Sequence, residues 1–240
     1  MFLRSVENLN QSVRQREHPF NIPTIHSLQK LVFNQPVTFF VGENGSGKST
    51  LLEGIADRCE FNLAGGGKSN VFSVHEDHST LGTYLRLAWM PKTTNGFFLR
   101  AESFYQFASH IDEIAKEYPS IYDAYGGQSL HHQSHGESFF SLFNHRFRGG
   151  GIYLLDEPEA ALSPQRQLAL LKVMHDLVKE GCQFIIATHS PILLGYPEAT
   201  IYHFDDQIVE IPYEDVSHVQ LTKYFLTNRA HFLQQLFEED

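Results

Sequence analysis

Cysteine is scarce in this sequence: Cys59 and Cys182 are the only two, and they stand far apart without metal-binding spacing. A small disulfide-stapled scaffold and a cysteine-ligated zinc module both need more cysteines than this, so both classes of protein are excluded. We expect the two thiols to be buried and reduced, as in a cytoplasmic protein.

Long apolar runs are also missing. No stretch approaches the roughly 18 consecutive apolar residues that a membrane-spanning helix needs. Residues 1–7 lack the charged start and apolar core of a signal peptide. We therefore expect a cytoplasmic protein that does not insert directly into a membrane.

A surplus of basic residues is absent as well. Lys and Arg number 18 against 28 Asp and Glu, which gives a formal net charge of −10 and disfavours tight non-specific DNA binding. Residues 198–240 hold nine acidic residues against Lys223 and Arg229. This acidic tail is either a solvated surface or a protein-docking face.

The remaining composition is that of an ordinary globular chain, 42% hydrophobic and 19% charged over 240 residues, enough for one large domain. Periodicity predicts strands over residues 37–41, 70–74, 83–90, 97–100, 152–155 and 183–188. It predicts helices over residues 48–63, 102–118, 164–179 and 214–237, with a shorter one opening near residue 134. Turn residues indicate hairpins at Pro91 to Gly96 and at Asp205-Asp206. The helix over residues 164–179 is expected to align Leu168, Leu171, Met174, His175 and Val178 on one face.

Residues 42–50 match the pattern G-x-x-x-x-G-K-[ST] at every fixed position, between an apolar strand and a helix start. Glycines let such a loop turn tightly and aim backbone N–H groups at one phosphate, and the helix dipole adds positive charge. Lys48 can reach the β- and γ-phosphates, and the Ser49 hydroxyl can coordinate Mg²⁺. The residues predicted to hold the nucleotide are Gly42, Glu43, Asn44, Gly45, Ser46, Gly47, Lys48, Ser49 and Thr50.

A second candidate lies where the apolar residues 152–155 end in Asp156 and Glu157. An apolar run of this kind is typical of a parallel strand buried on both faces, and ligands bind at the carboxyl edge of such sheets. Asp156 is expected to hold Mg²⁺, and Glu157 to act as general base towards the attacking water. His189 follows the next apolar strand and is expected to contact the γ-phosphate or the water.

With these three segments in order, the chain resembles the ABC-type ATPase family. Ser134-His135-Gly136-Glu137 is similar to the family's Leu-Ser-Gly-Gly-Gln signature, with His135 in place of a glycine and Glu137 in place of the glutamine. The resemblance implies an α/β P-loop fold with a mostly parallel core sheet flanked by helices, an antiparallel β part and a small helical signature subdomain. It implies one domain over residues 1–240, with a core lobe at 1–100 and 150–240 and the helical subdomain at 101–149.

The resemblance also implies a mechanism. The cofactors would be ATP and Mg²⁺, and two copies would form an ATP-dependent homodimer in head-to-tail arrangement. Ser134, Gly136 and Glu137 of one copy would then cap the γ-phosphate held by the other copy. A further protein or nucleic-acid partner is expected, of unknown identity.

Two positions depart from the family pattern. Ser163 stands where the family has the D-loop aspartate. The Q-loop glutamine has no clean counterpart, and Glu102, or else Gln106, is the candidate for the residue that faces Mg²⁺.

Three functional readings follow. Glu159 directly after Asp156-Glu157-Pro158 resembles the compact stand-alone bacterial ATPases of the chromosome-maintenance and repair branch. The nucleotide-binding subunit of a membrane ABC transporter is the alternative. A nucleotide-dependent binding module that hardly hydrolyses is the third, and Glu157 argues against it because such a module needs no base.

Two smaller features have competing readings. His131, His132 and His135 could suggest a metal, but no cysteine or paired carboxylate accompanies them, and their place beside the signature explains them better. Phe20 is either a core residue or a ring that stacks on adenine.

Overall fold

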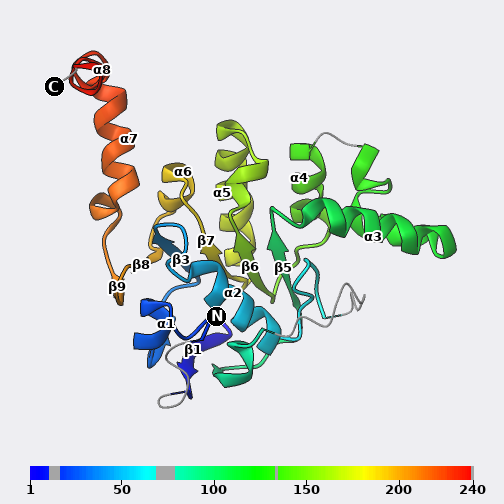
Figure 1. The fold of residues 1–240 in the computed structure, drawn as a ribbon. Coiled ribbons are helices and arrows are strands. Elements are labelled where there is room, and N and C mark those ends of the chain that lie inside the picture. The colour runs from blue at the N-terminus through cyan, green and yellow to red at the C-terminus, as the bar shows by residue number, and fades with distance from the viewer. Residues whose placement is uncertain (11–16, 69–78, 133–134, 239–240) are drawn as a thin grey trace.

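The computed structural model of this protein describes residues 1–10, 17–68, 79–132 and 135–238. Within these residues the chain forms two sheets, one of six strands and one of three, with helices packed around them (Figure 1). The expected strand over residues 70–74 and the signature residue Ser134 lie outside the described residues. In the part that is described, no helix is both long and apolar enough to cross a membrane.

The six-stranded sheet runs in the order β5-β6-β7-β3-β8-β9. Its strands are β3 (Val37–Gly42), β5 (Gly96–Arg100), β6 (Ile152–Asp156), β7 (Gln183–Ala187), β8 (Thr200–Phe204) and β9 (Ile208–Glu210). All neighbours pair in parallel except β8 and β9, which form the hairpin expected at Asp205-Asp206. Every residue of β3, β6 and β7 is buried, as apolar parallel strands covered on both faces require.

The smaller sheet is antiparallel, in the order β2-β1-β4, and contains β1 (Leu3–Asn8), β2 (Lys30–Val32) and β4 (Leu85–Trp89). The expected hairpin between residues 83–90 and 97–100 is therefore wrong. β4 pairs with β1, whereas β5 enters the other sheet beside β6. Pairing with strands distant in sequence decides this arrangement, and the local turn residues do not reveal it.

The helices are α1 (Pro23–Ser27), α2 (Lys48–Arg58), α3 (Phe104–Glu117), α4 (His135–His145), α5 (Pro164–Lys179), α6 (Pro191–Leu194), α7 (Ser217–Thr227) and α8 (Arg229–Phe237). Helices α3, α4 and α5 share one apolar core with one face of the large sheet. Helix α2 and the small sheet share a second core with the other face. The large sheet is thus covered on both sides, which leaves its carboxyl edge as the place for a site.

Two helix predictions need correction. Helix α2 ends at Arg58 and not near residue 63, because Glu60 adopts a left-handed backbone (φ 62°) that reverses the chain. Helix α5 has the expected bounds, but its buried residues are Gln167, Leu170, Met174 and Leu177. Leu168, expected on the inner face, is 59% exposed, so the expected stripe is rotated from the buried one.

Phe20 is a core residue. Its ring is buried and packs edge-to-face on Tyr84, with the centroids 5.2 Å apart, and this agrees with the core alternative. Cys59 and Cys182 are both free thiols; Cys182 is buried as expected, whereas Cys59 is only partly buried.

Helices α7 and α8 form a C-terminal arm (residues 217–237) that projects from the body beyond β8 and β9 (Figure 1). The ring of Phe232 holds the two helices together by packing on Tyr224 and Phe225. Several apolar side chains of the arm are exposed, namely Leu221, Leu226, Leu236 and Phe237.

Candidate functional site

The phosphate loop lies between β3 and α2, with Gly42, Gly45 and Gly47 at positive φ. A Cβ on Gly47 would lie 2.8 Å from Thr24 Oγ1, so this glycine is needed for both its backbone and its space. The Thr24 hydroxyl donates to the Ser46 carbonyl oxygen. Helix α1 therefore braces the loop, a contact that the sequence does not indicate.

Lys48 lies inside this loop and is only 5% exposed. Its Nζ donates to the carbonyl oxygens of Gly42 at 2.7 Å and of Glu43 at 2.9 Å. Burial lowers the pKa of Lys48, and the charges of Glu157 and Asp156 oppose that shift. Ser46 Oγ is buried and has no hydrogen-bond partner among the described residues, so an acceptor such as a phosphate oxygen would satisfy it.

The loop meets the acidic strand end through one hydrogen bond. Ser49 Oγ donates to Asp156 Oδ1 at 2.9 Å, across two elements far apart in the chain. Asp156 is 4% exposed, and burial raises its pKa to about 6, although the Ser49 hydrogen bond and Arg100 both lower it. The Arg100 Nε lies 3.6 Å from Asp156 Oδ2. A buried carboxylate beside a hydroxyl is a donor set that suits a hard cation.

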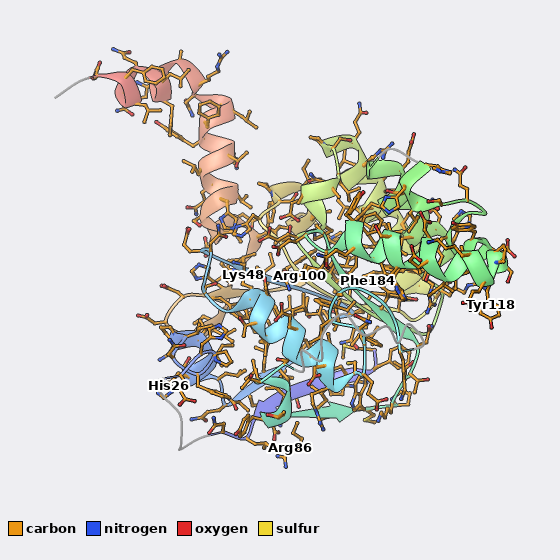
Figure 2. The ribbon with its side chains drawn as sticks, turned by 45° about the vertical axis from the view of Figure 1, so that its right-hand side comes forward. His26, Lys48, Arg86, Arg100, Tyr118 and Phe184 are labelled. Carbon is orange, nitrogen blue, oxygen red and sulfur yellow. The ribbon has the colours of Figure 1, made fainter. Side chains whose placement is uncertain are left out.

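Arg100, the last residue of β5 (labelled in Figure 2), connects several carboxylates. Its Nη1 contacts Glu53 Oε1 at 2.5 Å, and its Nη2 contacts Glu102 Oε2 at 3.5 Å. A pocket of about 350 Å³ opens here, lined by Ser49, Arg100, Ala101, Glu102, Asp156, Glu157 and Ala160. No sequence motif points to Arg100, since a strand-terminal arginine has many possible roles.

Magnesium would fit at Ser49 and Asp156. Proteins usually hold this ion by one or two carboxylate or hydroxyl groups and let substrate phosphates and water supply the rest. Among the described residues, no group of three or more His, Cys, Asp or Glu is placed to hold a metal ion. Glu102 lines the same pocket with its side chain 83% exposed, whereas Gln106 is exposed on α3 and does not line it.

Glu157 leaves the end of β6 with a left-handed backbone (φ 49°), and its N–H donates to the Ala187 carbonyl oxygen at 2.9 Å. Its Oε1 lies 3.8 Å from His189 Nε2. The backbone N–H of His189 donates to Glu159 Oε1 at 2.6 Å. The carboxylate and the imidazole thus share one edge of the sheet, and Glu159 fixes the turn that carries the histidine.

The signature segment begins helix α4, as its pattern predicts. Gly136 packs under Arg166 of α5, because a Cβ there would meet Arg166 Nη1 at 2.3 Å. Arg166 also lies 3.6 Å from Glu137 Oε1. Neither Gly136 nor Glu137 lines the pocket at Ser49 and Asp156. Ser163, in the D-loop position, caps α5 by accepting from the Arg166 N–H.

Two family models match parts of the chain. One is described as "AAA domain, putative AbiEii toxin, Type IV TA system" and matches residues 139–195, and the other is described as "AAA domain" and matches residues 20–72. The second match contains the phosphate loop, and the first contains Asp156, Glu157 and His189.

Curated relatives include two import proteins. The xylose/arabinose import ATP-binding protein XylG of Sulfolobus acidocaldarius is 29% identical over 192 residues, which cover 70% of this chain and 73% of that protein. The nucleoside import ATP-binding protein NupA of Lactococcus lactis is 27% identical over 167 residues, which cover 62% of this chain and 32% of that protein. The chain therefore spans most of the first protein and only about a third of the second.

Solved structures share the fold. CbiO1 from Clostridium perfringens, part of the ABC transporter complex CbiONQ, superposes with a TM-score of 0.53 at 18% identity and covers 97% of this chain and 99% of that one. An ATP-binding cassette of another ABC transporter gives a TM-score of 0.50 at 16% identity, covering 96% and 97% of the two chains.

The fold and the site define an ATP-hydrolysing P-loop protein, with a phosphate loop and an acidic strand end at one edge of a mostly parallel sheet. Taken together, the family models, the relatives and the fold support an ABC-type ATPase superfamily member.

Proposed function

We propose that this chain is a stand-alone ABC-type ATPase that hydrolyses Mg-ATP at the interface of a head-to-tail homodimer. The observation that carries the proposal is the hydrogen bond of 2.9 Å between Ser49 and Asp156. It joins the phosphate loop to the strand end that also presents Glu157, 3.8 Å from His189. Nucleotide phosphates bound by the loop would lie next to a candidate base.

Each residue then has a role in hydrolysis. The loop N–H groups and Lys48 hold the phosphates, and Ser49 and Asp156 hold Mg²⁺, which would neutralise charge on the phosphate oxygens. Glu157 accepts a proton from water as the water oxygen bonds to the γ-phosphorus and the bond to the β-phosphate oxygen breaks. The products are ADP and phosphate. His189 orients the water or donates to the γ-phosphate.

The second copy would supply the signature. The N–H of Gly136 lies in the first turn of α4, where a helix N-terminus attracts anions, and Glu137 follows. Ser134 lies outside the described residues and is assigned to the cap from its place in the sequence alone. In their own copy, Gly136 and Glu137 do not line the Ser49–Asp156 pocket, which favours a role towards a neighbouring copy. We propose a helical subdomain over residues 101–149 that carries this segment, and a core lobe over residues 1–100 and 150–240.

Mixing two inactive variants tests the shared site. Lys48→Ala is expected to abolish nucleotide binding, and Ser134→Arg to abolish hydrolysis by blocking the cap. A mixed dimer keeps one intact site, built from the loop of one copy and the signature of the other. In an equal mixture about half of the dimers are mixed, and each of these has one intact site out of two. The mixture should therefore recover about a quarter of the wild-type rate.

The control is a mixture of Lys48→Ala with Asp156→Asn. Both of these changes lie on the nucleotide-holding side, so no intact site can form and no recovery is expected. Equal inactivity of both mixtures would show that the signature does not act on a neighbouring copy.

A membrane ABC transporter subunit is the second candidate, because curated relatives are named import or export ATP-binding proteins. The chain departs from the transporter pattern by Glu102 at the Q-loop position and by a degenerate signature. Co-purification from solubilised membranes with a multi-span protein would favour the transporter role. Recovery of the chain from the soluble fraction, without such a protein, would favour the stand-alone ATPase.

We propose the cytoplasm as the compartment of this protein, because its two free thiols stay reduced there. We also propose a protein or nucleic acid as its further partner.

A further inference from the structure

Two imidazoles lie together beside the phosphate loop. His189 follows β7, and His218 is the second residue of α7. Their ring centroids are 5.2 Å apart, with the planes inclined by 56°. The Nε2 atom of each ring is buried, and neither has a hydrogen-bond partner among the residues that the structure describes.

The surroundings of His218 belong to the nucleotide site. Burial lowers the pKa of His218, and the neighbouring His189 lowers it further. Glu43 and Lys48 of the phosphate loop also act on this ring, the first raising its pKa and the second lowering it. His218 therefore lies within electrostatic range of the charged groups of the loop. A neutral imidazole with the proton on Nε2 is a hydrogen-bond donor.

Unpaired buried polar atoms are costly, and most find a partner. Three such atoms belong to the phosphate loop or to this histidine pair: the Oγ of Ser46, and the Nε2 atoms of His189 and His218, whose ring centroids are 5.2 Å apart. One ligand with several acceptor oxygens would satisfy all three. The terminal phosphate of a nucleoside triphosphate offers such oxygens, and a diphosphate lacks that group.

His218 differs from His189 in the element that carries it. It stands at the base of the C-terminal arm, next to Val219, which is buried in the core. Beyond this base the arm leaves the body (Figure 1), and α8 contains no buried residue. A contact at His218 would therefore act where the arm is attached.

We propose that His218 is a second imidazole that binds the terminal phosphate of the nucleotide, and that this contact ties the C-terminal arm to the nucleotide state. The inference rests on the proposed nucleotide site. It assigns this chain a nucleotide-responsive segment outside the phosphate loop, the acidic strand end and the signature.

The first test compares the affinities of the non-hydrolysable analogue AMP-PNP and of ADP, each with Mg²⁺. His218→Phe keeps a ring against His189 but removes the donor. It should weaken AMP-PNP binding about tenfold, the usual effect of losing one charge-assisted hydrogen bond, and leave ADP binding unchanged. His218→Gln, which retains an N–H donor, should restore most of the preference. His231→Ala, an exposed histidine of the same arm, is the matched control and should behave as wild type.

The second test measures amide hydrogen exchange over residues 217–237. In the wild type, AMP-PNP should slow exchange at the base of the arm more than ADP does, and His218→Phe should abolish that difference. Equal weakening of both nucleotides by His218→Phe, unchanged affinities, or an exchange difference that survives the substitution would overturn the inference.

The same titrations separate the two proposals. If wild-type protein does not bind AMP-PNP, or if Lys48→Ala binds it as tightly as wild type, the proposed nucleotide site is wrong and the inference falls with it. If those controls behave as expected but His218→Phe still discriminates between AMP-PNP and ADP as wild type does, the nucleotide site stands and the role of His218 is refuted.

Discussion

Two adjacent carboxylates at the end of β6 sit in different environments. Asp156 is 4% exposed and its pKa is raised to about 6 by burial, whereas the side chain of Glu157 is 46% exposed. A buried carboxylate is stabilised most by a bound cation, and an open one can exchange protons with water. The proposed division into a metal ligand, Asp156, and a base, Glu157, agrees with these two environments.

Asp156→Asn is expected to stabilise the metal-free protein, and more so at higher pH. Because the pKa in the folded state is raised from 3.8 to about 6, the stabilising effect of the protonated carboxyl is present below pH 3.8 and is lost as the pH rises through about 6. Asparagine resembles the protonated form at every pH. In urea unfolding with chelator, the advantage of the variant should grow by roughly 1 kcal/mol between about pH 5 and about pH 8.

The exposed Asp123→Asn serves as the control and should show no such growth. An Asp156→Asn advantage that stays constant across this pH range would mean that the carboxyl is not held neutral by burial.

At the scale of elements, helix α5 connects the site to the core through Gln167. Its Nε2 donates to the Leu162 carbonyl oxygen at 2.9 Å, and its Oε1 accepts from Ser190 Oγ at 2.6 Å. Ser190 in turn caps α6 by accepting from the N–H groups of Ile192 and Leu193. One buried amide therefore joins the segment after β6 to the segment after β7, which carries His189.

Gln167→Leu should lower the free energy of unfolding by about 1–3 kcal/mol, since it leaves the Leu162 carbonyl and the Ser190 hydroxyl proton without their partners. Gln165→Leu, the same change at an exposed position of the same helix, is expected to have little effect. Chemical denaturation of the two variants makes the comparison. Equal losses of stability would show that the buried amide adds nothing specific.

The sequence was most informative where local pattern and chemistry coincide. The apolar strands before Gly42 and Asp156 and the bounds of α5 follow from composition and caps alone. Pairing between strands that are distant in the sequence was not predictable. For this reason the sequence did not reveal that β4 pairs with β1 instead of forming the expected hairpin. Gln167 was missed as a core residue because periodicity alone favoured its neighbour Leu168.

Within the site, the sequence predicted the residues of the motifs but not the residues that contact and position them. Arg100 and His218 belong to no sequence pattern, and the pattern that contains Glu159 did not indicate its contact with His189. Only the folded chain brings these three residues to Asp156 and His189. The proposed roles of the motif residues, including Ser134 beyond the described part of the chain, await the variants described above.

At the scale of the whole molecule, one copy holds the loop, the acidic strand end and His189 at a single edge of the sheet. Helix α4, which begins with the segment that resembles the signature, packs with α3 and α5 on one face of that sheet, and neither Gly136 nor Glu137 lines the pocket at Ser49 and Asp156. In the proposed head-to-tail pair, each copy would offer its nucleotide edge and its signature to the other.

Light scattering on Glu157→Gln tests this account most directly. Removing the base should let ATP and Mg²⁺ bind without being consumed, so the dimer accumulates and the measured mass doubles from the monomer value of 27.4 kDa. The exposed Glu117→Gln should not accumulate a dimer under the same conditions. If Glu157→Gln binds the nucleotide yet keeps the monomer mass, two copies do not enclose ATP between them, and the central claim is contradicted.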